Sequence, residues 1–271
     1  MRIACFISSH GYGHATRSLA VLDVLSQKFQ SLEISIFSSL PKPFLLQNLN
    51  ISKLTAYNTK TDIGLIQKTP FEHDLIKTIS EWEQFLNFKS SANQKTAEMV
   101  KEINPEFILC DISPLGIKLG KQLKIPTILI ENFTWDWILQ AYVSAEPKFL
   151  PIIENLNEIF SYPNLRIQTD PICDRIQGCR LVNPIFRMPR GSTSETKRKI
   201  GISDNSQVIL ITTGGITQDF QFITKLEQFP HYNFIVSGER PKEHSYKNIF
   251  FLPHNSPIYF PDIVNISSIV I

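Results

Sequence analysis

Long apolar runs are absent from this sequence of 271 residues. No segment reaches the roughly 18 consecutive apolar residues that form a membrane-spanning helix, so we expect no transmembrane segment and leave only peripheral membrane contact open. The apolar stretch after Arg2 gives way to Ser8-Ser9-His10 and is too short for the hydrophobic region of a signal peptide. We therefore expect a cytoplasmic protein.

A marked excess of charge of one sign is absent as well. Lysine and arginine number 27 against 25 aspartates and glutamates, which gives a formal net charge of +2. Proteins that bind nucleic acid through its phosphates usually carry a basic patch or stripe. The short cluster Lys197-Arg198-Lys199 fits the solvated face of a helix, so we expect no nucleic-acid partner.

Cysteine is scarce and irregularly spaced, with four residues and no CxxC pair. Cys5 and Cys110 stand in apolar, strand-like segments, where a thiol behaves as a small buried hydrophobe. Cys173 and Cys179 are close enough in sequence to pair, but in a cytosolic protein we expect both to be reduced. The sequence predicts neither a disulfide framework nor a metal site.

What the sequence does contain is an alternation of short apolar segments with helical patterns. A chain of this length usually forms about two domains. The alternation indicates βαβ units and a mostly parallel sheet, so the predicted fold class is α/β with doubly wound domains. We expect a loop at 58–72, strands at 3–8, 33–38, 51–57, 107–111 and 127–131, and helices from about 15, at 73–88, at 95–103, after 113 and at 135–160.

Two prolines and a glycine without apolar periodicity mark residues 183–192 as a linker. The N-terminal domain is therefore expected at 1–182 and a second domain at 193–271. The alternation restarts there, with a helix at 195–200, strands at 208–213, 234–237 and 249–252, and a helix at 218–229. Because the chain stops within an apolar half-strand at 267–271, we expect the second domain to be incomplete or to be completed by a partner chain.

The stretch Ser8-Ser9-His10-Gly11-Tyr12-Gly13-His14-Ala15-Thr16-Arg17 is the strongest candidate for a site. It joins the first predicted strand to the first predicted helix, which places free backbone N–H groups and the positive end of a helix dipole at the carboxyl edge of the sheet. Its glycines allow a ligand to approach the backbone closely. Asp111, Glu131 and Asn132 end or follow other predicted strands, and ligands of doubly wound folds bind at this edge.

These stretches resemble the GT-B-fold glycosyltransferases. The resemblance is closest to the glycosyltransferase-like domain of plant L-arabinokinases and its stand-alone bacterial homologues. More distantly, the stretches resemble the family that transfers N-acetylglucosamine to the lipid-linked cell-wall precursor and the plant glycosyltransferases. It implies two Rossmann-like domains, the first for the acceptor and the second for the donor. It rests on the motifs at residues 11–17, 62–67, 110–114 and 132–137 and on Thr213-Gly214-Gly215.

The resemblance implies an inverting glycosyltransferase with His14 as general base toward an acceptor hydroxyl and Asp111 as its orienting partner. Imidazole chemistry gives the same pair, because a neutral histidine can accept the hydroxyl proton and a carboxylate behind the ring stabilises the imidazolium. The expected co-substrate is a nucleotide sugar, in particular a UDP-sugar, with a sugar or lipid-linked acceptor and no cofactor. The remaining candidates are His10, Gly11, Tyr12, Gly13, Glu131, Asn132 and Trp135 for the acceptor, and Arg17, Gly214, Gly215 and His254 for the donor.

Each assignment has an alternative. The Gly-x-Gly-His turn is also compatible with a packed histidine, and the spacing of His10 and His14 with a zinc pair, although the intervening glycines argue for a loop. Asp111 is also placed to cap the helix near Pro114, and Trp135 and Trp137 are compatible with a core role. For the whole chain, the first alternative is a non-catalytic sugar- or nucleotide-binding module or a degenerate or split glycosyltransferase half. The second is a nucleotide-sugar epimerase of the same fold.

Overall fold

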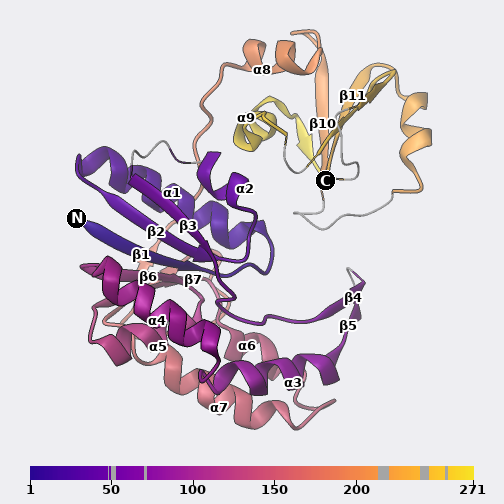
Figure 1. Cartoon of the computed structure of the whole chain (residues 1–271). Coiled ribbons are helices and arrows are strands. Elements are labelled where there is room, and N and C mark those ends of the chain that lie inside the picture. The colour runs from indigo at the N-terminus through magenta and orange to yellow at the C-terminus, as the bar shows by residue number, and fades with distance from the viewer. Residues whose placement is uncertain (48, 50–52, 70–71, 213–219, 239–243, 254–255) are drawn as a thin grey trace. The chain divides into compact units, whose positions relative to one another are not determined.

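The computed structural model describes residues 1–47, 49, 53–69, 72–212, 220–238, 244–253 and 256–271 (Figure 1). The chain divides into two compact units, Met1–Phe186 and Arg187–Ile271, and this division falls within the segment predicted as a linker. Gly214, Gly215 and His254, predicted to contact the donor, lie outside the described residues. None of the described helices is long and apolar enough to cross a membrane.

The N-terminal unit contains a seven-stranded sheet in the order β3-β2-β1-β6-β7-β8-β9. Every neighbouring pair in this sheet is parallel. The chain runs outward from β1 in one direction through β2 and β3, and in the other through β6 to β9, so the order reverses beside β1 and β6. The strands are β1 Arg2–Ile7, β2 Glu33–Ser38, β3 Lys53–Asn58, β6 Phe107–Asp111, β7 Thr127–Glu131, β8 Leu165–Thr169 and β9 Arg180–Val182.

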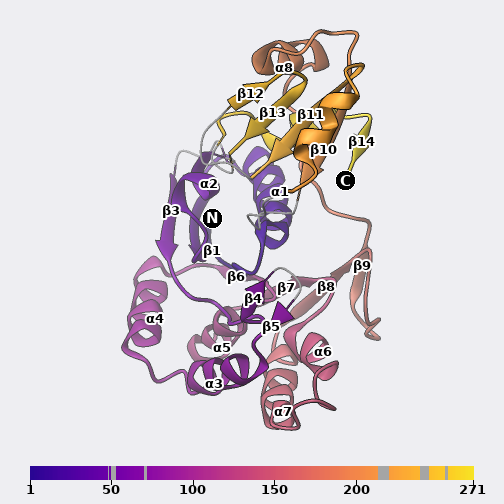
Figure 2. The same ribbon diagram turned by 90° about the vertical axis from the view of Figure 1, so that its right-hand side faces the viewer.

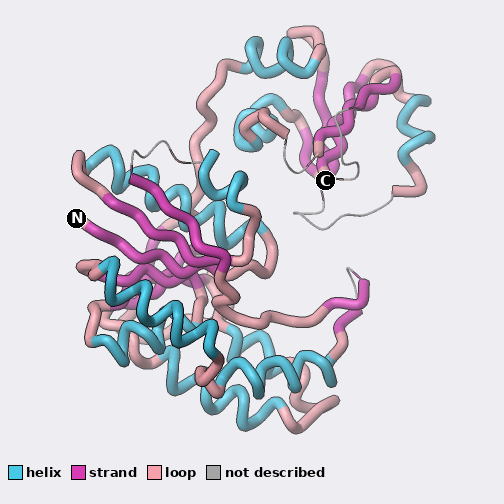
Figure 3. Tube along the Cα trace, in the orientation of Figure 1, coloured by secondary structure: helices cyan, strands magenta, loops and turns pink. Residues whose placement is uncertain are grey.

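Helices cover both faces of this sheet because side chains alternate along each strand. Ile3, Cys5 and Ile7 of β1 pack in one buried cluster with α1 and α2, whereas Ala4 and Phe6 pack in another with α3, α4, α5, α6 and α7. Figure 3 shows these helices beside the strands. Their bounds are α1 Tyr12–Lys28, α2 Lys42–Gln47, α3 Leu75–Leu86, α4 Ser91–Ile103, α5 Pro114–Leu123, α6 Trp135–Gln140 and α7 Phe149–Phe160.

Several segments differ from the elements expected from the sequence. Helix α2 and strands β8 and β9 are among the elements that were not expected, and the described part of the helix predicted at 218–229 holds only the 3-10 helix η1 (Ile223–Gln228). The predicted loop at 58–72 contains the short antiparallel pair β4 (Gln67–Thr69) and β5 (Glu72–His73). The helix predicted at 135–160 is divided into α6 and α7, with turns at 141–145 between them.

The C-terminal unit contains a five-stranded sheet in the order β12-β13-β11-β10-β14 (Figure 2). Ile269 and Val270 of β14 pair in parallel with Ile209 and Leu210 of β10, so the predicted terminal half-strand is part of the sheet. The elements are α8 Thr193–Ile200, β10 Gln207–Thr212, the 3-10 helix η1 Ile223–Gln228, β11 Tyr232–Ser237, β12 His244–Tyr246, β13 Ile249–Leu252, α9 Phe260–Ile266 and β14 Ile269–Val270.

Gly116 allows α5 to lie close against the sheet. A Cβ at this position would stand 2.6 Å from Phe6 Cβ and 2.7 Å from Cys110 Sγ. We expect Gly116→Ala to lower the free energy of unfolding by about 1–3 kcal/mol, because an overpacked core forces side chains and backbone to shift. Urea denaturation measures this, with Gln122→Ala on the same helix expected to change stability by less than about 0.5 kcal/mol. Equal effects of the two changes would contradict the close packing.

Candidate active site

The loop between β1 and α1 brings His14 and Arg17 to the carboxyl edge of the sheet. Gly11, which precedes the first helical residue Tyr12, has a φ of 86°, a backbone conformation that favours glycine. A Cβ at Gly11 or Gly13 would meet nothing within 4 Å, so the backbone of this turn is open. His14 and Arg17 are three residues apart and therefore share one face of α1.

His14 and Asp111 form a buried pair. His14 Nδ1 lies 2.8 Å from Asp111 Oδ1, and the two side chains are 9% and 1% exposed. Asp111 is the last residue of β6, and its carbonyl accepts a hydrogen bond from the Ser8 N–H (3.2 Å), which joins the ends of β1 and β6. The carboxylate can only accept, so we assign the Nδ1 proton to His14, which leaves Nε2 with a free lone pair.

Arg17 binds the same carboxylate with two nitrogens. Its Nε donates to Asp111 Oδ2 (2.8 Å), its Nη2 donates to Asp111 Oδ1 (2.5 Å), and its Nη1 donates to Asn132 Oδ1 (2.9 Å). The Ser18 hydroxyl donates to Oδ2 (3.1 Å). Arg17 Nη2 also lies 3.3 Å from His14 Nδ1. Because Nδ1 carries the ring proton in our assignment, it cannot accept a hydrogen bond from Arg17. The guanidinium, predicted as a donor-phosphate ligand, instead pairs with Asp111 and Asn132.

This arrangement keeps Asp111 ionised. Burial acts to raise the pKa of Asp111, but the charge of Arg17 and hydrogen bonds from Arg17 and His14 outweigh it and hold the pKa below its ordinary value. The pKa of Arg17 is raised, since the attraction of Asp111 and Glu131 exceeds the opposing effect of burial. The site therefore holds a permanent ion pair next to a histidine.

Asp111 is not the cap of α5. That role belongs to Ser113, whose Oγ accepts from the Gly116 N–H (3.1 Å). Between the two residues, the buried Ile112 adopts a φ of 45°, in the left-handed region that β-branched residues rarely occupy. Such a conformation costs about 1–3 kcal/mol and is commonly found at functional sites. Asp111 contacts α1 through Arg17, while Ser113 starts the next helix.

Trp135 is a core residue and not an acceptor platform, contrary to expectation. Its side chain is 1% exposed, and its indole N–H donates to Asp62 Oδ2 (2.9 Å). The His10 ring meets Trp135 edge-on at 5.2 Å, and a Cβ on Gly64 would stand 2.6 Å from His10 Nδ1. Trp137, which was not selected as an acceptor candidate, is 42% exposed.

Glu131 also lies away from the expected acceptor position. It faces the same side of the sheet as Leu129, whereas Asp111 faces the side of Leu109 and α1. Its Oε1 accepts from Arg166 Nε (2.9 Å) and Gln168 Nε2 (2.8 Å), while its buried Oε2 has no partner among the described residues. Glu131 thus anchors neighbouring strands on the opposite face from His14.

Asp62 is a site residue that the sequence reasoning did not select, although its motif was noted. It is buried, accepts hydrogen bonds from Ser8 and Trp135, and is close enough to His14 and Asp111 for their charges to influence it. Burial raises the pKa of Asp62, against the lowering effect of those hydrogen bonds. The loop 59–66 is therefore attached to the site through this carboxyl group.

His10 and Tyr12 line the remaining part of the loop. Burial lowers the pKa of His10, and the nearby His14 and His73 add to this effect. The Tyr12 ring packs against Phe44 at 4.6 Å. Among the described residues, no three histidine, cysteine, aspartate or glutamate side chains gather as metal ligands. His14 is paired through Nδ1 with Asp111.

Sequence comparisons give two curated relatives. No protein-family model matches the chain. L-arabinokinase of Arabidopsis thaliana is 20% identical over 216 residues, which are 78% of this chain and 21% of that protein. A UDP-glycosyltransferase of Arabidopsis thaliana is 23% identical over 145 residues, which are 52% of this chain and 28% of that protein. The matched region thus spans only 21% to 28% of the length of these relatives.

Solved structures extend the similarity to the whole chain. The glycosyltransferase of Streptomyces sp. SF2575, in complex with thymidine diphosphate, matches 100% of this chain and 75% of its own chain with a TM-score of 0.61 at 14% identity. At this identity the match establishes the fold. Together with the sequence relatives it confirms the resemblance predicted from the motifs. The chain therefore has the fold of the GT-B glycosyltransferases and resembles L-arabinokinase in sequence.

Proposed function

We propose that this chain carries the acceptor side of an inverting glycosyltransferase that uses a nucleotide sugar. The main support is the buried hydrogen bond of 2.8 Å between His14 Nδ1 and Asp111 Oδ1 at the carboxyl edge of the sheet. This bond holds the tautomer in which His14 Nε2 can accept a proton. The order of strands reverses at β1 and β6, which is where doubly wound folds bind their ligands.

In the proposed reaction, His14 Nε2 takes the proton of an acceptor hydroxyl as the acceptor oxygen bonds to the anomeric carbon of the donor sugar. The bond from that carbon to the nucleotide diphosphate breaks, and its electron pair leaves with the diphosphate. Attack opposite the leaving group inverts the anomeric configuration. Asp111 stabilises the imidazolium, and base catalysis of this kind contributes about 10²- to 10⁴-fold.

The proposed donor is a UDP-sugar. One relative is named a UDP-glycosyltransferase, while the Streptomyces structure holds thymidine diphosphate, so a sugar linked to thymidine diphosphate is the second donor to test. Gly214, Gly215 and His254 remain proposed donor contacts. The proposed acceptor is a hydroxyl compound, either a sugar or a lipid-linked molecule.

Replacing His14 by alanine tests the assignment of the base. Release of UDP or thymidine diphosphate is measured with each donor and a panel of hydroxyl acceptors. We expect His14→Ala to slow release by at least about 100-fold, because the imidazole that accepts the hydroxyl proton is removed. His231→Ala, at an exposed position of the C-terminal unit, is the control and is expected to keep full activity. Circular dichroism checks that both variants fold.

Undiminished transfer by folded His14→Ala would refute the role of this histidine. Binding of the nucleotide sugar without turnover under all conditions would refute transfer and favour a binding module. Conversion of the nucleotide sugar in the absence of acceptor would favour an epimerase.

A further inference from the structure

A pocket in the N-terminal unit lies away from the His14–Asp111 pair, between the end of β3 and helices α3 and α4. Its volume is about 550 Å³, and neither His14 nor Asp111 lines it. Small-molecule sites usually enclose about 300–1,000 Å³. The pocket is therefore large enough for a small organic ligand.

Aromatic and aliphatic side chains supply its apolar surface. Tyr57 is half-buried and is the outer member of a stack, with its ring 4.9 Å from Phe37, which in turn lies 4.5 Å from Phe6. Phe85, held edge-on against Trp82, also lines the pocket. Because the stack continues into the core, the Tyr57 ring is held in place before any ligand arrives, which reduces the entropy lost on binding.

The polar residues that line the pocket are mostly uncharged amides and hydroxyls. Asn58, Gln84, Ser90 and Asn93 are among them. The lysine at position 60 is paired with Glu81 (Nζ to Oε2, 2.8 Å), so most of the charge at the rim is compensated. Lys95 adds one cation. These amides and hydroxyls can both donate hydrogen bonds to a ligand and accept them from it, and they do not require the ligand to be charged.

We propose that this pocket binds an uncharged sugar unit. A pyranose presents apolar C–H faces, which fit against Tyr57 and Phe85, and hydroxyl groups around its edge, which both donate and accept hydrogen bonds. Rigid aromatic surface with a few surrounding polar groups is the usual composition of a small-ligand site. The proposal concerns binding at a site separate from His14, so it stands independently of the transfer reaction.

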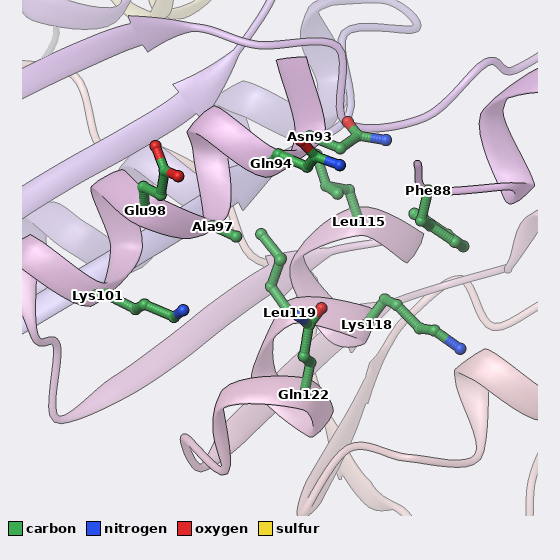
Figure 4. Close-up of a pocket in the computed structure, with 10 residues that line it drawn as sticks. All are labelled: Phe88, Asn93, Gln94, Ala97, Glu98, Lys101, Leu115, Lys118, Leu119 and Gln122. Carbon is green, nitrogen blue, oxygen red and sulfur yellow. The ribbon is translucent and has the colours of Figure 1, made fainter. Parts of the chain in front are cut away.

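A neighbouring pocket on the other side of α4 makes a useful comparison (Figure 4). It has a volume of about 240 Å³, and lysines 101 and 118 and Glu98 are among its lining residues. Figure 4 shows Gln94 on α4 and Leu119 and Gln122 on α5 around it. Both pockets are lined by two lysines and one glutamate, but the smaller one lies below the volume usual for small-molecule sites, so we expect no sugar there.

The pocket and the candidate active site share one loop. Ile63 lines the pocket, while the preceding residue, Asp62, accepts the Trp135 indole hydrogen bond next to His10. A sugar bound in the pocket therefore lies against the opposite side of the loop that carries Asp62.

Saturation-transfer NMR and calorimetry on the full chain test the proposal with glucose, galactose, cellobiose and lactose as probes. We expect saturable binding of at least one of them. Ala92→Trp, at an exposed position that lines the pocket, is expected to weaken this binding at least about tenfold by filling it. Gln94→Trp is the matched control, because it introduces the same side chain two residues away, where α4 lines the smaller pocket. We expect this variant to bind the sugar with the affinity of the parent. His14→Ala is expected to bind as the parent does, whether or not the parent transfers sugar.

Three results would overturn the proposal. The first is the absence of saturable binding for all four probes. The second is binding that is weakened by Gln94→Trp and kept by Ala92→Trp, which would place the sugar in the smaller pocket. The third is binding of glucuronate with none of the neutral probes, which would indicate an anion site.

Discussion

Replacing Asp111 by asparagine is expected to reduce sugar transfer by about 10⁴-fold, the loss that the equivalent change causes in serine-protease triads. The physical reason is the tautomer of His14. The carboxylate can only accept the Nδ1 proton across 2.8 Å, whereas an amide in its place can donate to Nδ1 and move the ring proton to Nε2. Nε2 then has no lone pair for the acceptor hydroxyl. Release of the nucleotide diphosphate at saturating acceptor measures this loss.

The same substitution leaves Arg17 without its counter-charge. The arginine side chain is 11% exposed, and removal of one partner from a buried ion pair typically costs about 3–5 kcal/mol. Activity must therefore be compared below the melting temperature of the variant, with circular dichroism as the check of folding.

Ser18→Ala is the matched control, since it removes one hydrogen bond from Asp111 Oδ2 and keeps both His14 and Arg17. We expect it to retain activity within about tenfold, as befits the loss of a single hydrogen bond. More than a tenth of parental transfer by folded Asp111→Asn would contradict the proposed role.

The sequence predicted the elements that position His14 and Asp111 because both follow regular patterns. An apolar strand, a glycine turn and a helix identify the start of the fold, and the end of the apolar segment at 107–111 identifies the acid. Parallel strands in a doubly wound sheet bring these two ends together whatever lies between them. Topology therefore brings the ends of β1 and β6 together, and the direction of the Asp111 side chain completes the pairing.

Other features depended on side-chain directions and contacts that no periodicity records. Glu131 and Asp111 both end strands, yet they face opposite sides of the sheet, and only the neighbours Leu129 and Leu109 reveal which side each one takes. Asp62 lies in a segment without periodicity, so its contacts with Ser8 and Trp135 require the three-dimensional structure.

Arg17 shows the same limit. Its position on the first turns of α1 was predictable, but whether its guanidinium binds a ligand or a neighbouring acid depends on the rotamer and on the place of Asp111. The structure directs three of its nitrogens to Asp111 and Asn132.

Replacing Arg17 by methionine is expected to destabilise the chain by about 3–5 kcal/mol at neutral pH, because Asp111 is left buried and ionised without its cation. The loss is expected to depend on pH. In the parent, the pKa of Asp111 is held below its ordinary value of 3.8, so the stability that it contributes is present above about pH 4 and is lost as the pH falls through the lowered pKa. In the variant, burial is no longer offset, and the pKa of Asp111 rises above that ordinary value.

The variant therefore loses stability as the pH rises through this raised pKa, and the difference between parent and variant is largest near neutral pH and shrinks in acid. Melting temperatures of both proteins across the acid range measure the difference. Arg17→Lys keeps a cation but loses the two-nitrogen contact, and we expect a stability between those of the parent and Arg17→Met. A difference between parent and Arg17→Met that stays constant with pH would show that lost packing, and not the charge of Asp111, causes the destabilisation. The pH dependence thus separates the electrostatic role of Arg17 from the role of its apolar stem, which methionine largely retains.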